Sequence, residues 1–319
     1  MMQNAKENTM RLVFFIAALA SVLAVMLICV FLFTQGLPAM ASIGVNNFLL
    51  GQKWAPTASE PVFGVLPMIL GSIYVTAGAI AIGVPIGIFV ALFMARMCPK
   101  PLYRFMKPAI SLMAGVPSVI YGFFGMMVLV PLIFDKLGKR FDMMSGDTML
   151  AASILLGIMI LPTVISIAET NLRAVPQELY EAAVALGASH ERAVFKVVLP
   201  AARSGVLAAI VLGVGRAVGE TMAVKMVVGN QAVMRLPHQY LKGVRTLTTN
   251  IVTEMGYVEH GSLHNGALIA TGVVLFVFIL LINMLFSVLN QDKQNRREKK
   301  RLPQQSSAIR IESLGEKND

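Results

Sequence analysis

Six long apolar stretches constrain the fold of this sequence more than any other feature. The run from Leu12 to Gln52 has no charged residue, and its most apolar part, residues 12–33, suits a helix crossing ~30 Å of hydrocarbon. Charged residues make up 14% of the chain, against roughly 25% in soluble domains, so they cannot cover the surface of a soluble fold. The sequence therefore predicts an all-α membrane protein with six transmembrane helices. The other five apolar stretches are residues 66–95, 109–134, 148–168, 204–228 and 267–289.

The distribution of Lys and Arg predicts how these helices are oriented. Eighteen of these residues lie in the N-terminus, the loops 96–108 and 169–203 and the tail 290–319, whereas seven lie in the connections on the other side. Because cytoplasmic loops carry the excess of Lys and Arg, we expect both termini in the cytoplasm and the protein in the cell (inner) membrane. This topology accounts for the net charge of +10 without nucleic acid.

The composition also divides the chain into three parts. Residues 1–65 hold the first transmembrane helix and an outer loop, and residues 66–289 hold the other five helices. The tail 290–319 is polar, basic and poor in large apolar residues, so we expect it to be mostly disordered. Its positive charge suits a topology anchor, or contact with anionic lipid.

The long loop 169–203 is patterned as two short helices at the membrane surface. Gly187 fits the left-handed position that ends a helix, and Ser189 fits the N-cap of the helix that follows. The small side chains of Ala182 and Ala183 allow close approach of another body to the first helix. An interfacial amphipathic hairpin without a partner explains the same spacing.

The residues of this loop carry a family resemblance. The stretch EAAVALGASHERAVFKVVLP resembles the EAA loop of ABC importer permeases, with the pattern E-A-A-x3-G-x9-I-x-L-P. The resemblance covers residues 66–289 and implies the type I ABC importer permease fold, with the helix before the glycine as a coupling helix that docks on an ATPase subunit. It also implies that a partner subunit uses ATP and that this chain binds no cofactor, which fits the lack of a P-loop. The matching residues in the segment 181–200 are Glu181, Ala182, Ala183, Gly187, Leu199 and Pro200, with Val197 in place of isoleucine.

The fifth apolar stretch carries charges inside the membrane. Arg216 and Glu220 are four residues apart, which predicts one shared helical face. An ionisable residue at this depth is a functional candidate, and a guanidinium matches the oxygen pairs of an oxyanion. A buried ion pair that only fixes helix packing is the alternative. Gly215 and Gly219 predict a small-residue face for tight helix contact.

Two further stretches point to a substrate. The sequences RAVGETMAV and YGFFG resemble phosphate importer permeases of the Pst system, and the PstC-type subunit in particular. The resemblance implies that Arg216 and Glu220 serve phosphate passage, with Ser118 and Tyr121 as further candidates for which helix packing is an equal explanation. It also implies three partners: a PstA-type permease, a cytoplasmic ATPase dimer and an external phosphate-binding protein.

Three alternatives remain open at this stage. A permease for another oxyanion or solute fits the same loop. An intramembrane enzyme would need acid–base groups in the membrane, but no histidine lies inside a predicted span. A structural scaffold leaves the EAA pattern unexplained. His260 and His264 lack the pattern of a zinc helix, so no metal site is expected.

Overall fold

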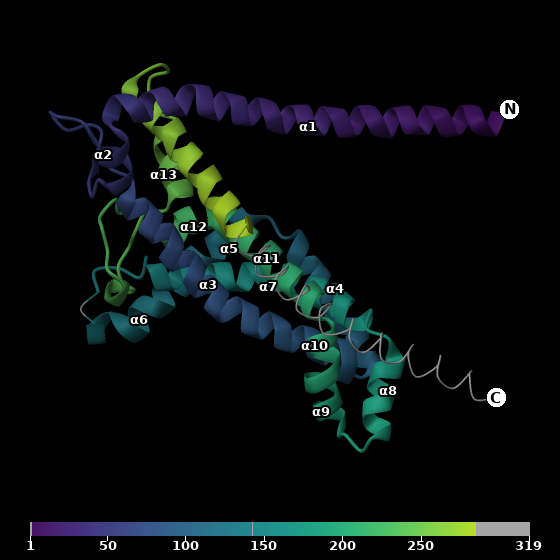
Figure 1. Ribbon diagram of the computed structural model, residues 1–319. Helices are drawn as coiled ribbons and strands as arrows, with labels where there is room; N and C mark the ends of the chain where they lie inside the picture. The colour runs from purple at the N-terminus through teal and green to yellow at the C-terminus, as the bar shows by residue number, and fades with distance from the viewer. Residues whose placement is uncertain (1, 142, 285–319) are drawn as a thin grey trace, which may run out of the picture. The chain divides into compact units, whose positions relative to one another are not determined.

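The computed structural model describes residues 2–141 and 143–284, and the side chains of all of these except residues 2–6 and 8. The predicted disordered tail, residues 290–319, lies outside the described residues, as does the end of the sixth apolar stretch. The described chain is mostly helical, as the apolar periodicity predicts, with one short hairpin of two strands (Figure 1).

The elements follow one another in a simple order. The two strands are antiparallel, with Trp54 opposite Phe63. Before the long loop the elements are α1 (Met2–Ile43), α2 (Val45–Leu50), β1 (Trp54–Ala55), β2 (Val62–Phe63), α3 (Leu66–Leu92), the π-helical segment η1 (Phe93–Met97), α4 (Lys100–Gly115), α5 (Ser118–Phe124), the π-helical segment η2 (Gly125–Leu129), α6 (Val130–Phe141) and α7 (Met149–Arg173). From the long loop onward they are α8 (Gln177–Ala185), α9 (His190–Ala193), the π-helical segment η3 (Val194–Val198), α10 (Leu199–Ala201), α11 (Arg203–Gly219), α12 (Met222–Val227), the 3-10 helix η4 (Pro237–Gln239), α13 (Leu247–Glu254) and a last helix, Leu263–Met284.

Five helical segments are long and apolar enough to cross a membrane, and a sixth span results if one bent pair counts as a single span. This agrees with the six predicted transmembrane helices. The bent pair is His190–Ala201 with Arg203–Gly219, which meet at 71°. The five single segments are Thr9–Ile43, Leu66–Met97, Ser118–Phe141, Met149–Arg173 and Leu263–Met284.

The third span differs from its predicted bounds. It begins at Ser118, whereas residues 109–115 belong to the separate helix α4. The break lies at Val116, whose backbone is extended with φ −68° and ψ 126°. Pro117 follows, and proline disfavours the helical conformation for the residue before it. Hydropathy alone did not reveal this break because apolar residues continue across it.

The first helix is longer than its predicted apolar core of residues 12–33. It continues through Pro38 to Ile43, and the part after residue 33 packs on the last helix. A Cβ added to Gly36 would lie 2.7 Å from Val273 Cγ2, and one added to Gly266 would lie 2.6 Å from Ala39 Cβ. Small residues therefore let the two helices approach closely.

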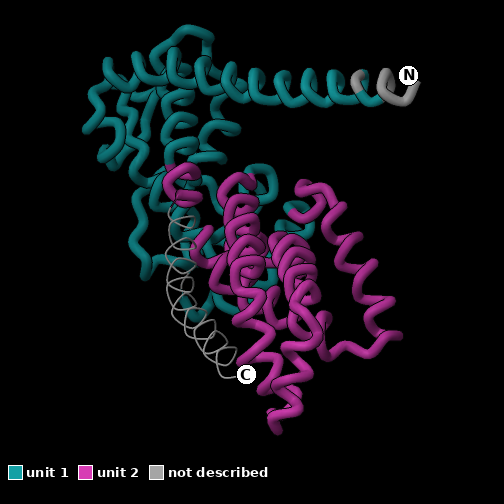
Figure 2. The backbone as a smooth tube through the Cα atoms, turned by 45° about the vertical axis from the view of Figure 1, so that its right-hand side comes forward, with its two compact units in different colours: residues 1–75, 122–152, 221–277 teal, residues 76–121, 153–220, 278–319 magenta. Residues whose placement is uncertain are grey.

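The chain divides into two compact units, coloured separately in Figure 2. Unit 1 comprises residues 1–75, 122–152 and 221–277, and unit 2 comprises residues 76–121, 153–220 and 278–319. One core of unit 1 packs around Phe48, Trp54 and Met68. The boundaries fall inside α3, α5, α7 and the last helix and at the break after α11, so they do not coincide with the three parts that the composition suggests.

Unit 2 is held together by close packing of α3 on α7. A Cβ on Gly83 would lie 2.6 Å from the carbonyl oxygen of Gly157, and one on Gly87 would lie 2.8 Å from Val164 Cγ1. Any larger residue at these positions of α3 would push the two helices apart. Val164 also packs in a cluster with Ile160 and Ala217, so α7 is enclosed by α3 and α11.

Candidate functional site

The charged span is a broken helix. α11 carries Arg216 and ends at Gly219, and Glu220 caps it with extended backbone at φ −70° and ψ 127°. α12 begins only at Met222. The helix that carries Arg216 ends directly before Glu220, so the shared face of Arg216 and Glu220 stays a prediction.

The side chain of Arg216 makes its polar contact with a residue of a different helix. Its Nη1 donates a hydrogen bond of 3.2 Å to Oγ1 of Thr163 on α7. Thr163 was not predicted from the sequence. Two features of the sequence mark Thr163. Its neighbour Pro162 lies within a helix, where proline leaves a backbone carbonyl without its usual donor. Thr163 also places a hydroxyl group in an otherwise apolar span.

Tyr121 belongs to the same region as Arg216. It lies within electrostatic reach of the Arg216 guanidinium, and its hydroxyl donates a hydrogen bond of 2.9 Å to the carbonyl oxygen of Met113. That bond ties the first turn of α5 to the end of α4. Ser118 is the first residue of α5, three positions before Tyr121.

These contacts define a candidate oxyanion site within unit 2. One of the five N–H groups of Arg216 is held by Thr163, and among the described residues the others have no protein acceptor. A guanidinium fixed in this way keeps donors for the paired oxygens of an anion. The structure thus brings Arg216, Tyr121 and Thr163 into one region, and Glu220 lies at the end of the helix that carries Arg216.

The predicted small-residue contact of α11 is only partly present. A Cβ on Gly213 would lie 2.8 Å from Val164 Cγ2, so this glycine allows close packing on α7. At Gly215 and Gly219 an added Cβ meets nothing within 4 Å in the described part of the chain. The prediction of a tight contact at Gly215 and Gly219 is therefore wrong for this chain by itself, and the two glycines leave open space beside Arg216.

The long loop forms the predicted pair of helices, seen as a hairpin in Figure 1. Gly187 has φ +84°, the left-handed conformation that ends α8, and the N–H of Ala188 donates to the carbonyl oxygen of Ala183. Ser189 caps α9 by accepting a hydrogen bond of 3.3 Å from the N–H of Arg192. Tyr180 and His190 also join the two helices, with 2.7 Å between the Tyr180 hydroxyl and His190 Nδ1.

The EAA residues fall into two groups. α8 has no buried residue, so Glu181 and Ala182 are exposed and Ala183 is partly so, and Leu186 is 90% exposed. Leu199, at the other end of the motif, packs against the core of unit 2, and Pro200 is partly buried. The first group presents a surface, and the second anchors the hairpin.

Unit 1 contains a polar cluster around Glu254 that the sequence did not reveal. We call Trp54, Arg245, Glu254 and His264 the Glu254 cluster. Glu254 Oε1 accepts from Arg245 Nη1 at 2.6 Å, and Glu254 Oε2 lies 2.8 Å from Trp54 Nε1 and 2.8 Å from His264 Nε2. These residues line part of a cavity of about 520 Å³. His264 is thus a partner of a carboxylate.

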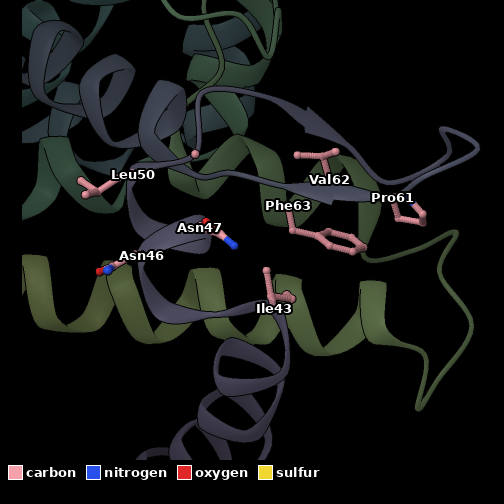
Figure 3. A pocket seen from close by; sticks show the side chains of 8 residues that line it. Ile43, Asn46, Asn47, Leu50, Pro61, Val62 and Phe63 are labelled. Atoms are coloured by element: carbon pink, nitrogen blue, oxygen red, sulfur yellow. The ribbon is translucent and has the colours of Figure 1, made fainter.

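Two further cavities of unit 1 differ in charge. The one in Figure 3, about 560 Å³, is lined entirely by uncharged residues between Ile43 and Phe63. Another, about 680 Å³, is bordered by Arg235, Lys242 and Asp147. Burial raises the pKa of the Asp147 carboxyl above its ordinary value.

Comparisons with known proteins identify the family of this chain. Residues 83–295 match the family model described as the binding-protein-dependent transport system inner membrane component. The chain belongs to this family. Its members are transporter permease subunits and not enzymes, so the chain is a multi-pass membrane permease.

Several relatives are similar over most of their length. A Bacillus subtilis protein named "Probable ABC transporter permease protein YqgH" is 41% identical over 87% of this chain and 90% of its own length. A protein of Mesorhizobium japonicum named "Phosphate transport system permease protein PstC" is 33% identical over 80% of this chain and 81% of its own. A protein of Methanocaldococcus jannaschii named "Probable phosphate transport system permease protein PstC" is 33% identical over 81% and 85%.

A solved structure supports the fold. An inward-facing form of the MetNI methionine ABC transporter has a chain that aligns with a TM-score of 0.57 at 20% identity, covering 71% of this chain and 94% of that chain. The permease therefore has the type I ABC importer fold predicted from the EAA loop.

Proposed function

We propose that this permease carries inorganic phosphate across the cytoplasmic membrane by alternating access, driven by ATP that a partner subunit hydrolyses. The observation that carries the proposal is the Arg216 guanidinium, which Thr163 holds at 3.2 Å beside the break between α11 and α12. A fixed guanidinium inside a membrane span suits the oxygen pairs of an oxyanion. Relatives named as phosphate permeases support phosphate over other oxyanions.

The hairpin of α8 and α9 is proposed as the coupling element. Its exposed first helix carries Glu181, Ala182 and Ala183, and the turn at Gly187 presents Leu186 to a partner. Exposed apolar side chains on a helix at a chain turn suit docking into a groove. The partner would be a cytoplasmic ATPase dimer, and this chain would bind no cofactor itself.

The remaining partners follow from the same proposal. A homologous PstA-type permease would complete the translocation path, and an external phosphate-binding protein would deliver the substrate. Both termini of this chain would lie in the cytoplasm, as the distribution of Lys and Arg predicts.

Substitutions at Arg216 test the substrate site in the reconstituted transporter. We expect Arg216→Lys to retain part of the phosphate uptake and Arg216→Gln to lose it, since lysine keeps the charge but not the fork of donors. Uptake in the double variant Arg216→Leu with Glu220→Leu should also be lost at normal assembly. Near-normal phosphate uptake in that double variant would show that Arg216 and Glu220 serve only as a structural pair. Competition by sulfate or molybdate as strong as by phosphate would point to another oxyanion.

Substitutions in α8 test the coupling assignment separately. Tryptophan at Ala183 adds bulk to the surface proposed to approach the ATPase, and valine at Gly187 is strained at φ +84°. Both variants should insert normally but lower ATPase binding and phosphate uptake. Normal uptake in both, at normal abundance, would reject α8 as the docking helix.

A further inference from the structure

A buried glutamate connects two helices of unit 2 beside the proposed coupling element. We call Tyr103, Lys107, Glu169 and Arg173 the Glu169 cluster. The side chain of Glu169 is 1% exposed. Its Oε2 accepts from Lys107 Nζ at 2.5 Å, and its Oε1 accepts from Tyr103 Oη at 2.8 Å and from Arg173 Nε at 2.7 Å. The cluster therefore links α4, which carries Tyr103 and Lys107, to the end of α7.

Two arginines extend this link to the end of the second span. Arg173 Nη2 donates to the carbonyl oxygen of Met94 in η1 at 2.7 Å. In the opposite direction, Arg96 of η1 donates from Nη2 to the carbonyl oxygens of Leu172 and Val175, at 3.0 and 2.9 Å. Each segment thus holds the backbone of the other through a charged side chain. The two carbonyl oxygens that Arg96 binds belong to the end of α7 and its connection, where helices leave such groups unpaired.

Arg96 also reaches the first residue of α8. Its Nη1 donates to Gln177 Oε1 at 2.8 Å. One guanidinium therefore contacts the last turn of α7, the connection at Val175 and the start of α8, all at once. A planar group with several fixed donors can set the direction of the chain between two helices in a way that a single contact cannot.

α8 is attached to the rest of unit 2 with little burial. None of the residues of α8 is buried, although Tyr180 is partly buried and packs against the core of unit 2. Because burial of apolar area is the main source of attachment between elements, a helix without it depends on polar contacts at its ends. The contacts of Arg96 and Tyr180 are such attachments for α8 among the described residues.

We propose that Glu169 and Arg96 are positioning residues that fix α8 to the ends of α3 and α7, so that movement of α8 is transmitted to the membrane helices. This inference rests on the proposed function of α8 as the coupling helix. Glu169 holds Arg173 in place, Arg173 holds η1, and η1 presents Arg96 to α8.

The test uses the complete transporter in proteoliposomes, with ATP hydrolysis and phosphate uptake measured on the same preparation. Glu169→Gln keeps the size of the side chain and removes its charge, and Arg96→Gln removes the fork that reaches Gln177. We expect phosphate uptake per ATP hydrolysed to fall about fivefold or more in both variants, at equal complex abundance. Arg96→Lys should retain only part of the wild-type phosphate uptake per ATP hydrolysed. Arg104→Gln is the matched control, because Arg104 is exposed on the same helix as Tyr103, and its ratio should equal that of the wild type.

A second measurement separates this inference from the proposed function. Trypsin can cleave after Arg192, which is exposed at the start of α9, and in the purified permease without ATPase we expect cleavage there to be about fivefold faster in both variants. Unchanged cleavage together with a wild-type ratio of uptake to hydrolysis would overturn the positioning role, and so would losses that follow complex abundance alone. If the wild-type complex does not take up phosphate, the proposed function fails, and faster cleavage in Arg96→Gln would still support the attachment of α8. If Glu169→Gln does not assemble, Arg96→Gln decides the outcome.

Discussion

Each of the two units contains one glutamate bound by three side chains, but the two arrangements differ in which partner is protected from water. In unit 2, Glu169 is 1% exposed, whereas Lys107 and Arg173 are 36% and 44% exposed. In unit 1, Glu254 is 17% exposed, and its partners Arg245 and His264 are almost as shielded, at 15% and 21%.

This difference in shielding decides whether the positive charges left behind can be solvated after the glutamate is removed. Lys107 and Arg173 can turn toward water when Glu169 is lost, so the charges left behind regain solvation. Arg245 is enclosed and bonded to Asn250 and to the carbonyl oxygen of Asn230, so it would keep an uncompensated charge. An unpaired buried charge is more costly than a lost hydrogen bond. The more buried glutamate is therefore expected to be the less important one for stability.

The largest effect should come from Glu254→Gln. We expect it to lower the stability of unit 1 by about 3–5 kcal/mol, because Arg245 loses its counter-charge in a shielded position. Trp54 is the single tryptophan of the chain and lies inside the Glu254 cluster, so its fluorescence during thermal unfolding reports on unit 1 directly. Glu259→Gln, which removes an exposed acid nearby, should leave the transition unchanged. Equal transitions for both variants would refute the counter-charge role.

A smaller loss is expected for Glu169→Gln. Its partners can be hydrated, so the cost should be about 1–3 kcal/mol, the range for a hydrogen-bonded group that loses its partner. The same detergent, pH and heating rate as for Glu254→Gln allow the two variants to be ranked. Glu178→Gln serves as the control, since Glu178 is exposed. A larger loss of stability for Glu169→Gln than for Glu254→Gln would reverse this ranking. It would show that burial of the glutamate itself sets its contribution to stability.

The smallest effect should come from Tyr103→Phe, and it depends on pH. The hydrogen bond to Glu169 raises the pKa of the Tyr103 phenol above its ordinary value, and burial adds to this. Because the folded-state pKa is raised, the phenol stabilises the fold fully below the unfolded pKa of about 10, and this contribution disappears as the pH rises through the folded pKa.

The advantage of the wild type over Tyr103→Phe should therefore be about 1 kcal/mol from neutral pH to about pH 10 and decrease above it. Thermal unfolding at a series of alkaline pH values measures this difference. Tyr257→Phe is the control, because Tyr257 is 92% exposed. A difference that grows with pH would contradict the hydrogen bond to Glu169.

Several local features of the fold and of the candidate site were predictable from the sequence. The turn at Gly187 and the N-cap at Ser189 appear where the pattern placed them, because each depends on residues close in sequence. Glycine spacing alone was a poorer guide, since Gly83 and Gly87 pack closely on α7 whereas Gly215 and Gly219, with the same four-residue spacing, meet nothing within 4 Å in the described part of the chain.

Other features could not be read from the pattern. The apolar pattern placed residues 204–228 in one span, but the helix ends at Gly219 and a second one begins at Met222. Likewise the apolar run hid the break before Ser118, since hydropathy measures solvent preference and not backbone direction. The partner of Arg216, Thr163, lies 53 positions earlier in the chain.

The sequence by itself determined that this protein lies in a membrane, how many apolar spans it has and how the hairpin turns at Gly187. These follow from composition and from contacts within a few residues, which hardly depend on the rest of the chain. Only the tertiary structure decided which charged and polar groups meet. Glu169 with Lys107, Glu254 with His264 and Arg96 with the start of α8 are pairs of residues on different elements, brought together by the packing of whole helices. Because an ion pair needs two side chains within a few ångströms of each other, only the packed fold could show which charges are paired and how well each is shielded from water.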